Sequence, residues 1–399
     1  SETFPAMGPV KAHLRGEQTR QQEQLAQLVV DDMNYRLTEE MSEFRPEHER
    51  MLWSLALMGS AFKKVYFDPS LDRQTSVFIP ADDVVVPYGA SDILTTPRIT
   101  HRQRKFKNEL RKMQVSGFYE DFDVGDPAKL SQNDFKDKLD TVEGYSSAND
   151  DRFTIYETCC YLHLEDDPEA DPNGIELPYV VTILKDSDKI LAIRRNWNES
   201  DPSKQPRQHF VHYIYIPGFG FYGLGLLHLL GNFSSASTSL LRQLVDAGTL
   251  SNLPGGLKTN GLRIKGEDTP IAPGEWRDVD VASGTVRDNI MPLPYKEPSV
   301  VLAQLLDKIV EEGRRLASTI DVKLNEMNGE MPVGTTLAIL ERTLKVMSAI
   351  QARNHVSMSQ EFKLIHKLVR DSLDPLDDHE LAEGYATVDI IPRSEEHTS

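Results

Sequence analysis

The sequence predicts an α+β fold: a mixed domain of helices and strands, followed by long helices around a small β-rich insert. Segments with strand-like alternation and segments with helical periodicity follow one another as far as Gly218, which is the pattern of an α+β domain. Residues 337–373 then contain neither Gly nor Pro. At about 1.5 Å per residue they could form one helix on the order of 55 Å long.

The first hundred residues predict two helices and a pair of strands. A polar helix is expected over residues 16–41 and a second over residues 51–58, which Gly59 should end. Residues 63–68 and 75–79 alternate like two strands, with turn-forming residues between them. These elements begin the mixed domain.

The next segment is strongly basic. Residues 97–113 hold seven Lys and Arg residues and are expected to form a basic helix. Such a helix could contact phosphates without reading sequence; the alternative is a surface helix that pairs with acidic neighbours. Residues 119–151 are acidic and polar and should be an exposed excursion, and strands are expected at residues 153–164, 179–193 and 210–216.

Beyond Gly218 the pattern changes. Helical periodicity runs through residues 224–247, with Gly248 as the expected stop, and returns over residues 299–318. The segment between these helices is β-rich and full of Gly and Pro. Residues 319–336 lack periodicity and precede the long helix. This order of elements (helix, insert, helix, loop, long helix) indicates a structural protein rather than an enzyme.

The composition of the chain argues against some classes of function. The 399 residues carry a formal net charge of −18, with 39% hydrophobic and 27% charged residues. This is the composition of a soluble globular protein, and its charge argues against a sequence-specific nucleic-acid binder, which normally has a basic domain. An acidic surface would still let DNA pass through a ring, because phosphates would not adhere to it.

Cys159 and Cys160 are the only cysteines in the sequence. Adjacent residues of a strand point to opposite faces, so no disulfide framework is expected, and a reducing compartment fits best. His163 follows closely, but three potential ligands crowded onto one strand are poorly spaced for zinc. No metal site is predicted.

We expect both ends of the given sequence to be truncated. There is no initiating Met and no signal peptide, and residues 393–399 look like a translated sequencing-adapter tail. We therefore exclude that tail from the expected fold and expect the native C-terminus to be missing.

A long stretch without Asp, Glu, Lys or Arg separates Arg207 from Arg242. A membrane-spanning helix needs about 20 consecutive apolar residues, whereas Pro217 and several glycines interrupt this stretch. A strand, a turn and a helix fit better, so no membrane insertion is expected. A membrane channel is kept as an alternative function.

Gly218, Gly220 and Gly223 form a literal GxGxxG between an expected strand and an expected helix, the context of a dinucleotide-binding fingerprint. The acidic residue that should follow a second parallel strand is missing, since Asp246 lies inside the helical pattern. A hinge into the helix is preferred, with a dinucleotide-dependent oxidoreductase as the alternative. No catalytic grouping appears elsewhere, so neither an enzyme nor a cofactor is expected.

Trp276 lies near the centre of the β-rich insert. Arg277 follows it directly, and Arg263 and Lys265 are close in sequence. Trp and Arg dominate binding hot spots, so this group is a candidate partner-docking site. The alternative is that Trp276 fills the core of a small domain.

Several short segments resemble those of a known protein family. No single segment is diagnostic, but their order and spacing along the chain are. The segments are residues 244–248, 253–256, 292–299 and 332–336, then Glu341, Arg342, Lys345 and Arg353, and upstream Trp53, Gly59, Phe62, Lys63 and residues 80–86. Through them the chain resembles the portal proteins (head-to-tail connectors) of tailed double-stranded DNA bacteriophages, closest to the short-tailed branch.

The resemblance implies a dodecameric ring around a DNA channel, at one vertex of the capsid. It divides the chain into a wing (1–223), two stem helices (224–247 and 299–318), a clip (248–298), a tunnel loop (319–336), a long wing helix (337–374) and the start of a truncated crown (375–392). In such a ring Lys323, Asn325 and Asn328 of the tunnel loop should face DNA.

The resemblance also implies partners and a location. The clip, with the Trp276 group, would dock the terminase large subunit and later the tail adaptor. Scaffolding and major capsid proteins would surround the ring, and double-stranded DNA would be contacted without sequence preference. The protein would assemble in the host bacterial cytoplasm and reside in the virion.

Overall fold

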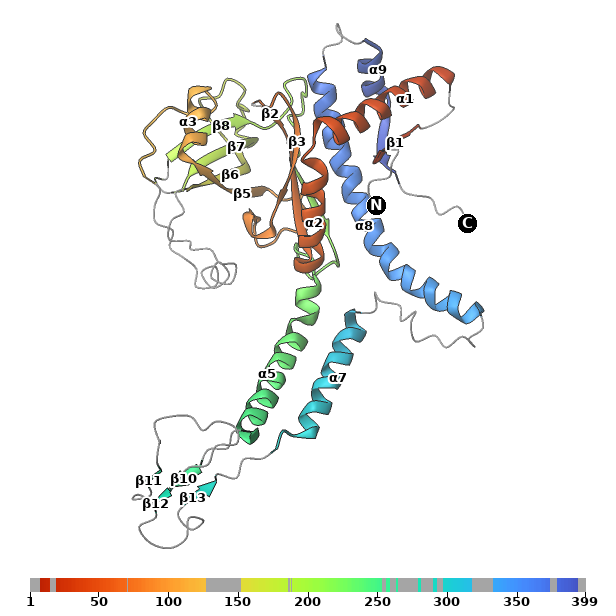
Figure 1. Cartoon of the computed structure of the whole chain (residues 1–399). Helices are drawn as coiled ribbons and strands as arrows, with labels where there is room; N and C mark the ends of the chain where they lie inside the picture. The colour runs from red at the N-terminus through yellow and green to blue at the C-terminus, as the bar shows by residue number, and fades with distance from the viewer. Residues whose placement is uncertain are drawn as a thin grey trace. The chain divides into compact units, whose positions relative to one another are not determined.

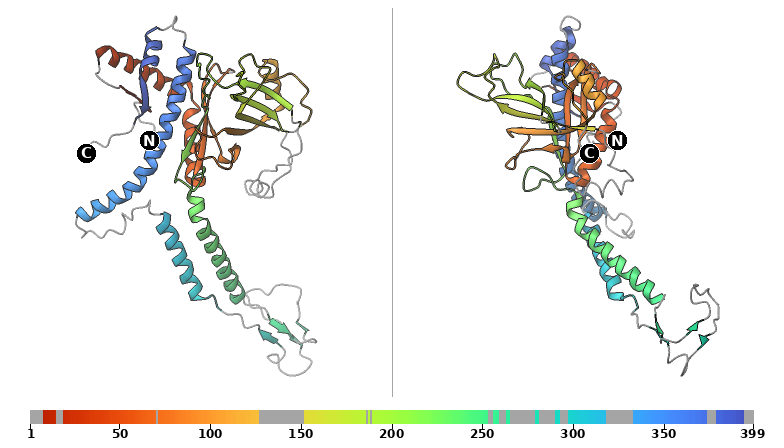
Figure 2. Two further views of the ribbon diagram at one scale, coloured as in Figure 1. Left: turned by 180° about the vertical axis from the view of Figure 1, so that it is seen from behind. Right: turned by 90° about the vertical axis from the view of Figure 1, so that its left-hand side faces the viewer.

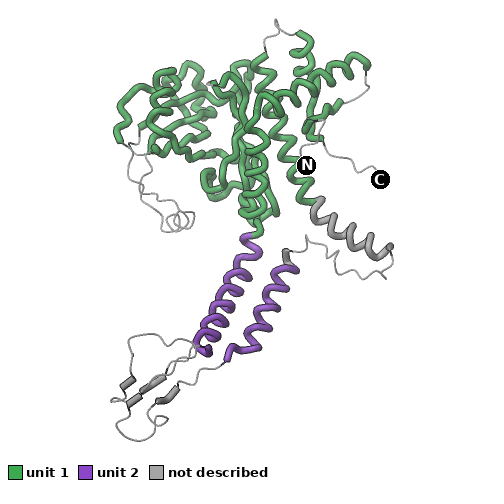
Figure 3. The backbone as a smooth tube through the Cα atoms, viewed as in Figure 1, with its two compact units in different colours: residues 1–226, 347–399 green, residues 227–346 purple. Residues whose placement is uncertain are grey.

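The computed structural model describes residues 8–14, 19–69, 71–126, 152–185, 187, 189–252, 256–258, 263–264, 279–280, 290–292, 297–317, 333–373 and 379–393. For residues 256–292 and for helical residues 316–317 and 333–348 it describes the backbone alone. The chain is an α+β protein with two compact units, coloured separately in Figure 3: residues 1–226 with 347–399, and residues 227–346.

Helices and antiparallel sheets alternate in the first unit (Figure 1). Its helical segments are α1 (Arg20–Tyr35), the π-helical turn η1 (Arg36–Glu40), α2 (Phe44–Met58), the 3-10 turn η2 (Ala81–Asp83), α3 (Lys107–Val115), the larger part of α8 (Val333–Ser372) and α9 (His379–Thr387). Its strands form three sheets: β1 (Val10–His13) with β14 (Asp389–Pro392); β3 (Arg73–Ile79), β2 (Ser60–Asp68) and β9 (Phe210–Ile214) in that order; and β4 (Val84–Val85), β5 (Arg98–Phe106), β6 (Arg152–Leu162), β7 (Leu177–Leu184) and β8 (Lys189–Arg195).

Local sequence explains where the first helices begin and end. Thr19 and Gln22 form a capping box at the start of α1, each side chain accepting a hydrogen bond from the other's backbone amide. Gly59 ends α2 with a φ of +87°, a left-handed conformation that favours glycine. The prediction of two helices with a stop at Gly59 is confirmed.

The prediction of a basic helix over residues 97–113 is wrong for its first half, which is strand β5, with α3 following. Arg98, Arg102 and Arg104 all occupy even positions, so on a strand they share one face. The spacing of four residues between Arg98 and Arg102 fits a helical turn, but the spacing of two between Arg102 and Arg104 fits only a strand, and the whole length of β5 pairs with β6. Residues 179–193 likewise form two strands, β7 and the start of β8, rather than one.

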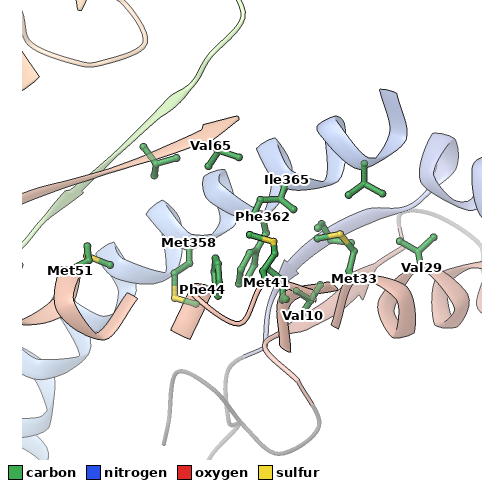
Figure 4. Packing of buried hydrophobic residues seen from close by; sticks show 14 of the residues in the cluster. Val10, Val29, Met33, Met41, Phe44, Met51, Val65, Met358, Phe362 and Ile365 are labelled. Atoms are coloured by element: carbon green, nitrogen blue, oxygen red, sulfur yellow. The ribbon is translucent and has the colours of Figure 1, made fainter. Parts of the chain in front are cut away.

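The long helix α8 supplies one wall of the main hydrophobic core. Met358, Phe362, Ile365 and Val369 recur at helical spacing and are buried. Figure 4 shows Phe362 and Met358 beside Phe44, which opens α2. The predicted breaker-free helix is confirmed, although it begins at Val333, within the segment expected to be a loop.

The two ends of the described chain pack together. β1 pairs with β14 in register, Val10 opposite Pro392, and α9 packs against α1, as Figures 1 and 2 show. The hydroxyl of Tyr385 on α9 donates a hydrogen bond to Asp32 on α1 at 2.6 Å. The described elements of the segment expected to begin a crown, residues 375–392, therefore belong to the first unit.

The second unit is a helical hairpin with short β ladders. α5 (Leu226–Asn252) and α7 (Val300–Ala317) run side by side in opposite directions (Figures 1 and 2). The ladders between them are β10 (Gly256–Lys258) with β13 (Ile290–Pro292) and β11 (Arg263–Ile264) with β12 (Val279–Asp280). The expected stop at Gly248 is wrong, because α5 continues to Asn252; one glycine inside a helix costs only about 1 kcal/mol.

Candidate functional site

Most residues singled out from the sequence lie outside the described part of the chain. These are Lys323, Asn325 and Asn328 of the expected tunnel loop, and Trp276, Arg277 and Lys265 of the expected clip. Arg263 lies on strand β11, where the backbone alone is described. The functional argument therefore rests on the surfaces and contacts of the two units.

Helix α7 approaches α5 at Phe233. A Cβ placed on Gly313 of α7 would lie 3.6 Å from the Cβ of Phe233 on α5, an ordinary van der Waals distance. Phe233 lies on the same side of α5 as Leu240 and Leu244, because these residues fall within about 40° of one another at 100° per residue. Phe233, Leu240 and Leu244 are half-buried and form the inner side of α5.

A second side of α5 is exposed among the residues that the structure describes. Leu227, Leu241 and Val245 are 52%, 53% and 58% exposed and also fall within about 40° of one another around the helix. Ser234 and Thr238 lie between them on the same side. We call these five residues the outer stripe.

The outer stripe has the composition of an interface. None of the 27 residues of α5 is buried in the single chain, and α7 adds exposed Val301 and Leu305 one turn apart. Leu241 and Val245 are one helical turn apart, and exposed apolar residues that lie together on a protein surface mark association sites. Small residues such as Ser and Thr between them would let another backbone approach closely.

The glycines of the GxGxxG segment serve backbone packing. A Cβ on Gly223 would collide with the carbonyl oxygen of Gly59, and one on Gly218 with the carbonyl oxygen of Tyr222. Gly220 has nothing within 4 Å of such an atom. The strand before the segment, β9, pairs antiparallel with β2, as do all strand pairs among the described residues. The parallel βαβ unit that a dinucleotide fingerprint requires does not occur among them.

A buried polar contact fixes this segment to the sheet. The Ser60 hydroxyl accepts a hydrogen bond from the Gly223 amide at 2.8 Å and lies 3.0 Å from His212 Nε2. The rings of His212, Phe62 and Phe221 form a compact cluster, with the His212 centroid 4.4 Å from that of Phe62 and 4.8 Å from that of Phe221. The chain therefore enters α5 from a rigid support.

Gly225→Ala should destabilise the protein by about 1–3 kcal/mol, because its Cβ would overlap the Gly59 amide nitrogen and force the backbone apart. Gly220→Ala is the matched control: it adds the same methyl group in open space, five residues earlier in the sequence, and should change stability by less than about 0.5 kcal/mol. Urea denaturation of both variants measures the difference. Equal losses would contradict the close-approach argument.

Three polar residues of α8, spaced four apart, bind β9 and the residue after it. Arg353 donates to the Tyr215 carbonyl at 2.7 Å, Ser357 donates to the His212 carbonyl at 2.9 Å, and Glu361 accepts from the Tyr213 hydroxyl. We call them the polar line of α8. Sequence reasoning missed this set, although polar residues at i, i+4 and i+8 on an otherwise apolar side were a visible signal.

The last member of the polar line belongs to a buried ion pair. Lys63 Nζ lies 2.7 Å from Glu361 Oε1, and both side chains are 0% exposed. Ser76 donates a third hydrogen bond to Glu361 at 2.6 Å, beside those of Lys63 and Tyr213. Burial by itself would raise the pKa of Glu361, but the Lys63 ammonium and these donors outweigh it and hold that pKa below its usual range.

Metal and thiol chemistry find no support in the described residues. No group of three or more His, Cys, Asp or Glu side chains there could hold a metal ion. Cys159 and Cys160 are free thiols that contact different core clusters, as their opposite directions on β6 require. Burial raises the pKa of Cys159 to about 12, so its reactive thiolate is suppressed.

None of the helices in the part of the chain that the structure describes combines the length and the apolar character needed to cross a bilayer. No model of a known protein family matches the chain, and no curated protein matches it.

Proposed function

We propose that the chain is the subunit of a bacteriophage portal: a ring, of twelve copies by the family resemblance, through which double-stranded DNA enters and leaves the capsid. The observation that carries the proposal is the outer stripe of α5. A closed ring repeats one heterologous contact, so each subunit needs an apolar surface left open in the monomer. The outer stripe, together with Val301 and Leu305 of α7, is such a surface.

The order of the elements supports the same proposal. Two antiparallel helices joined by short β ladders, followed by a helix of 40 residues, match the expected sequence of stem, clip, stem and long wing helix. In this proposal residues 248–298 dock the terminase large subunit and the tail adaptor, and scaffolding and major capsid proteins surround the ring in the virion. The net charge of −18 suits a conduit that DNA must slide through.

Electron microscopy of the purified protein tests the proposal. We expect closed rings with a central hole, and a mass of many subunits by light scattering. A wild-type protein that stays monomeric at micromolar and higher concentrations would exclude a ring built by this chain.

A pair of leucine variants tests the interface itself. Leu241→Glu places a charge in the outer stripe and should reduce the assembled fraction at least about tenfold, as loss of a central interface residue does. Leu250→Glu is the control, since Leu250 is 47% exposed on the same helix but lies about 180° from Leu241. Circular dichroism should show both variants folded. If both assemble like the wild type, the outer stripe is not the contact.

The alternative functions have their own measurements. A nicotinamide-dependent oxidoreductase would quench or shift cofactor fluorescence on titration, and a membrane channel would float with liposomes. The antiparallel setting of the glycine segment argues against the first.

A further inference from the structure

The outer stripe is small for the contact that a ring requires. A specific protein–protein contact buries about 800 Å² on each partner, of which about 450 Å² is apolar. Complete burial of one Leu or Val side chain removes only about 60–120 Å² from water. The three apolar residues of the outer stripe, with Val301 and Leu305 of α7, are between 43% and 71% exposed. Together they offer about 150–350 Å², so another surface of the chain has to contribute.

Helix α2 of the first unit carries a large exposed apolar surface. Trp53 is 79% exposed, and Leu57, one turn later, is 53% exposed. Arg50, whose side chain is 67% exposed, lies on the same side, within about 60° of Trp53 at 100° per residue. We call these three residues the α2 patch. Burial of a Trp side chain removes about 150–250 Å² from water, so the patch can supply much of the missing area.

The opposite side of α2 holds the patch in place. Met51 and Leu55 are 0% and 1% exposed and belong to the main hydrophobic core. Tyr88 and Phe219, which are more exposed than Trp53, lie in loops instead. A side chain on an anchored helix loses less conformational freedom on binding than one on a loop. The α2 patch is therefore the better-ordered contact surface.

The patch also has the composition of a contact. Trp and Arg are the residue types most enriched at binding hot spots. Arg50 pairs with Glu47 at 2.9 Å, and Arg45 pairs with Glu49 at 3.2 Å on the preceding turn. Charged groups thus border the apolar surface of Trp53, as they do at the rim of an interface.

The patch lies close to the start of the outer stripe. A Cβ placed on Gly225 would lie only 2.4 Å from the Leu57 carbonyl oxygen, so the last turn of α2 packs directly against Gly225. Leu227, the first residue of the outer stripe, follows Gly225 by two residues, and two residues span at most about 7 Å. A neighbour that contacts Leu227 therefore comes within reach of α2.

We propose that the α2 patch contacts a second copy of this chain and extends the contact made by the outer stripe. This inference rests on the proposed ring and adds a surface of the first unit to it. A closed ring repeats one heterologous contact, so the patch meets a different surface of the neighbour rather than the neighbour's own α2 patch. The missing contact area and the closeness of Leu57 to Leu227 are the reasons for a second copy as the occupant.

Charge-introducing variants of the full chain test the contact. Trp53→Glu and Leu57→Glu should each reduce the assembled fraction at least about tenfold, as loss of an interface hot spot does. Val115→Glu is the matched control, because Val115 is 74% exposed at the end of α3 in the same unit and lies outside the patch. Light scattering measures assembly, and circular dichroism should show all three variants folded.

Oxidation of the wild-type protein by hydroxyl radicals, read by mass spectrometry, tests the contact without a substitution. Trp53 should be oxidised in dilute, unassembled protein and protected in the assembled protein, because the centre of a contact excludes water. Trp197 is the internal control, since it is 4% exposed and should react little in either state.

The outcomes separate this inference from the portal proposal. A wild-type chain that forms no assembly would overturn both. If the wild type assembles while Trp53 stays as reactive as in the dilute protein, or while both patch variants assemble as well as Val115→Glu, only the α2 contact is overturned and the ring stands.

Discussion

Glu361→Gln should lower the free energy of unfolding by about 3–5 kcal/mol, the usual cost of leaving a buried charge without its partner. Lys63 would keep its ammonium in a site where its side chain is 0% exposed. The amide oxygen can still accept from Ser76 at the position of Oε1, while the amide NH2 group takes the place of Oε2, where the Tyr213 hydroxyl can accept a hydrogen bond instead of donating one. Equilibrium unfolding in urea measures the loss of stability.

Two further variants make this result specific. Glu49→Gln breaks an exposed ion pair with Arg45 on α2 and should cost less than about 1 kcal/mol. Adding Lys63→Met to Glu361→Gln removes the unpaired charge and should restore most of the lost stability, because uncharged replacements of buried pairs are well tolerated. The ion-pair interpretation fails if Glu361→Gln costs no more than Glu49→Gln.

Acidification from pH 7 to pH 4 should unfold the protein. Burial lowers the pKa of five histidines, to about 3 for the first and about 4 for the rest: His48, His101, His209, His212 and His366. Their pKa in the unfolded chain is about 6.5, so between that value and the folded pKa the unfolded state binds more protons. Stability is thus fully present above pH 6.5 and is lost as pH falls.

The expected size of this effect is large. Each such histidine contributes about 3 kcal/mol by pH 4, and a typical domain has only about 5–15 kcal/mol in total. Glu361, whose pKa is lowered, acts in the same direction at still lower pH. Urea midpoints between pH 7.5 and pH 4.5 would show the decline.

His212 allows a direct check of the cause. Burial alone lowers its pKa, so His212→Gln should flatten the pH dependence of stability by up to one proton between pH 6.5 and pH 4, whatever it does to stability at pH 7. His163→Gln, which removes an exposed histidine, serves as the control. An unchanged slope in His212→Gln would show that the buried imidazole is not the source.

Much of the fold could be predicted because strong periodic signals are local. The long helix α8 and the two helices of the hairpin follow from apolar spacing and from the lack of breakers, and the stop of α2 follows from one glycine. The prediction was wrong for strand β5 because the four-residue spacing of Arg98 and Arg102 fits a helical turn as well as a strand, while the two-residue spacing of Arg104 is a short signal. Only its partner β6, almost fifty residues later in sequence, decides between the two.

The candidate sites were less predictable, for a different reason. The outer stripe could be read as core from the sequence, since the pattern of Leu241 and Val245 does not say whether the covering partner is the same chain. The Lys63–Glu361 pair joins residues 298 positions apart, and nothing local links them.

The split of the first unit along the sequence has a consequence for synthesis on the ribosome. Residues 227–346 leave the exit tunnel before the C-terminal half of α8. Until that half of α8 emerges, the apolar side of the sheet of β2, β3 and β9 stays uncovered. During this interval the outer stripe and the uncovered sheet are both open to aggregation. Slower translation just after residue 346 would lengthen the interval, and a chaperone that shields α5 until β14 closes on β1 would raise the yield of native subunits.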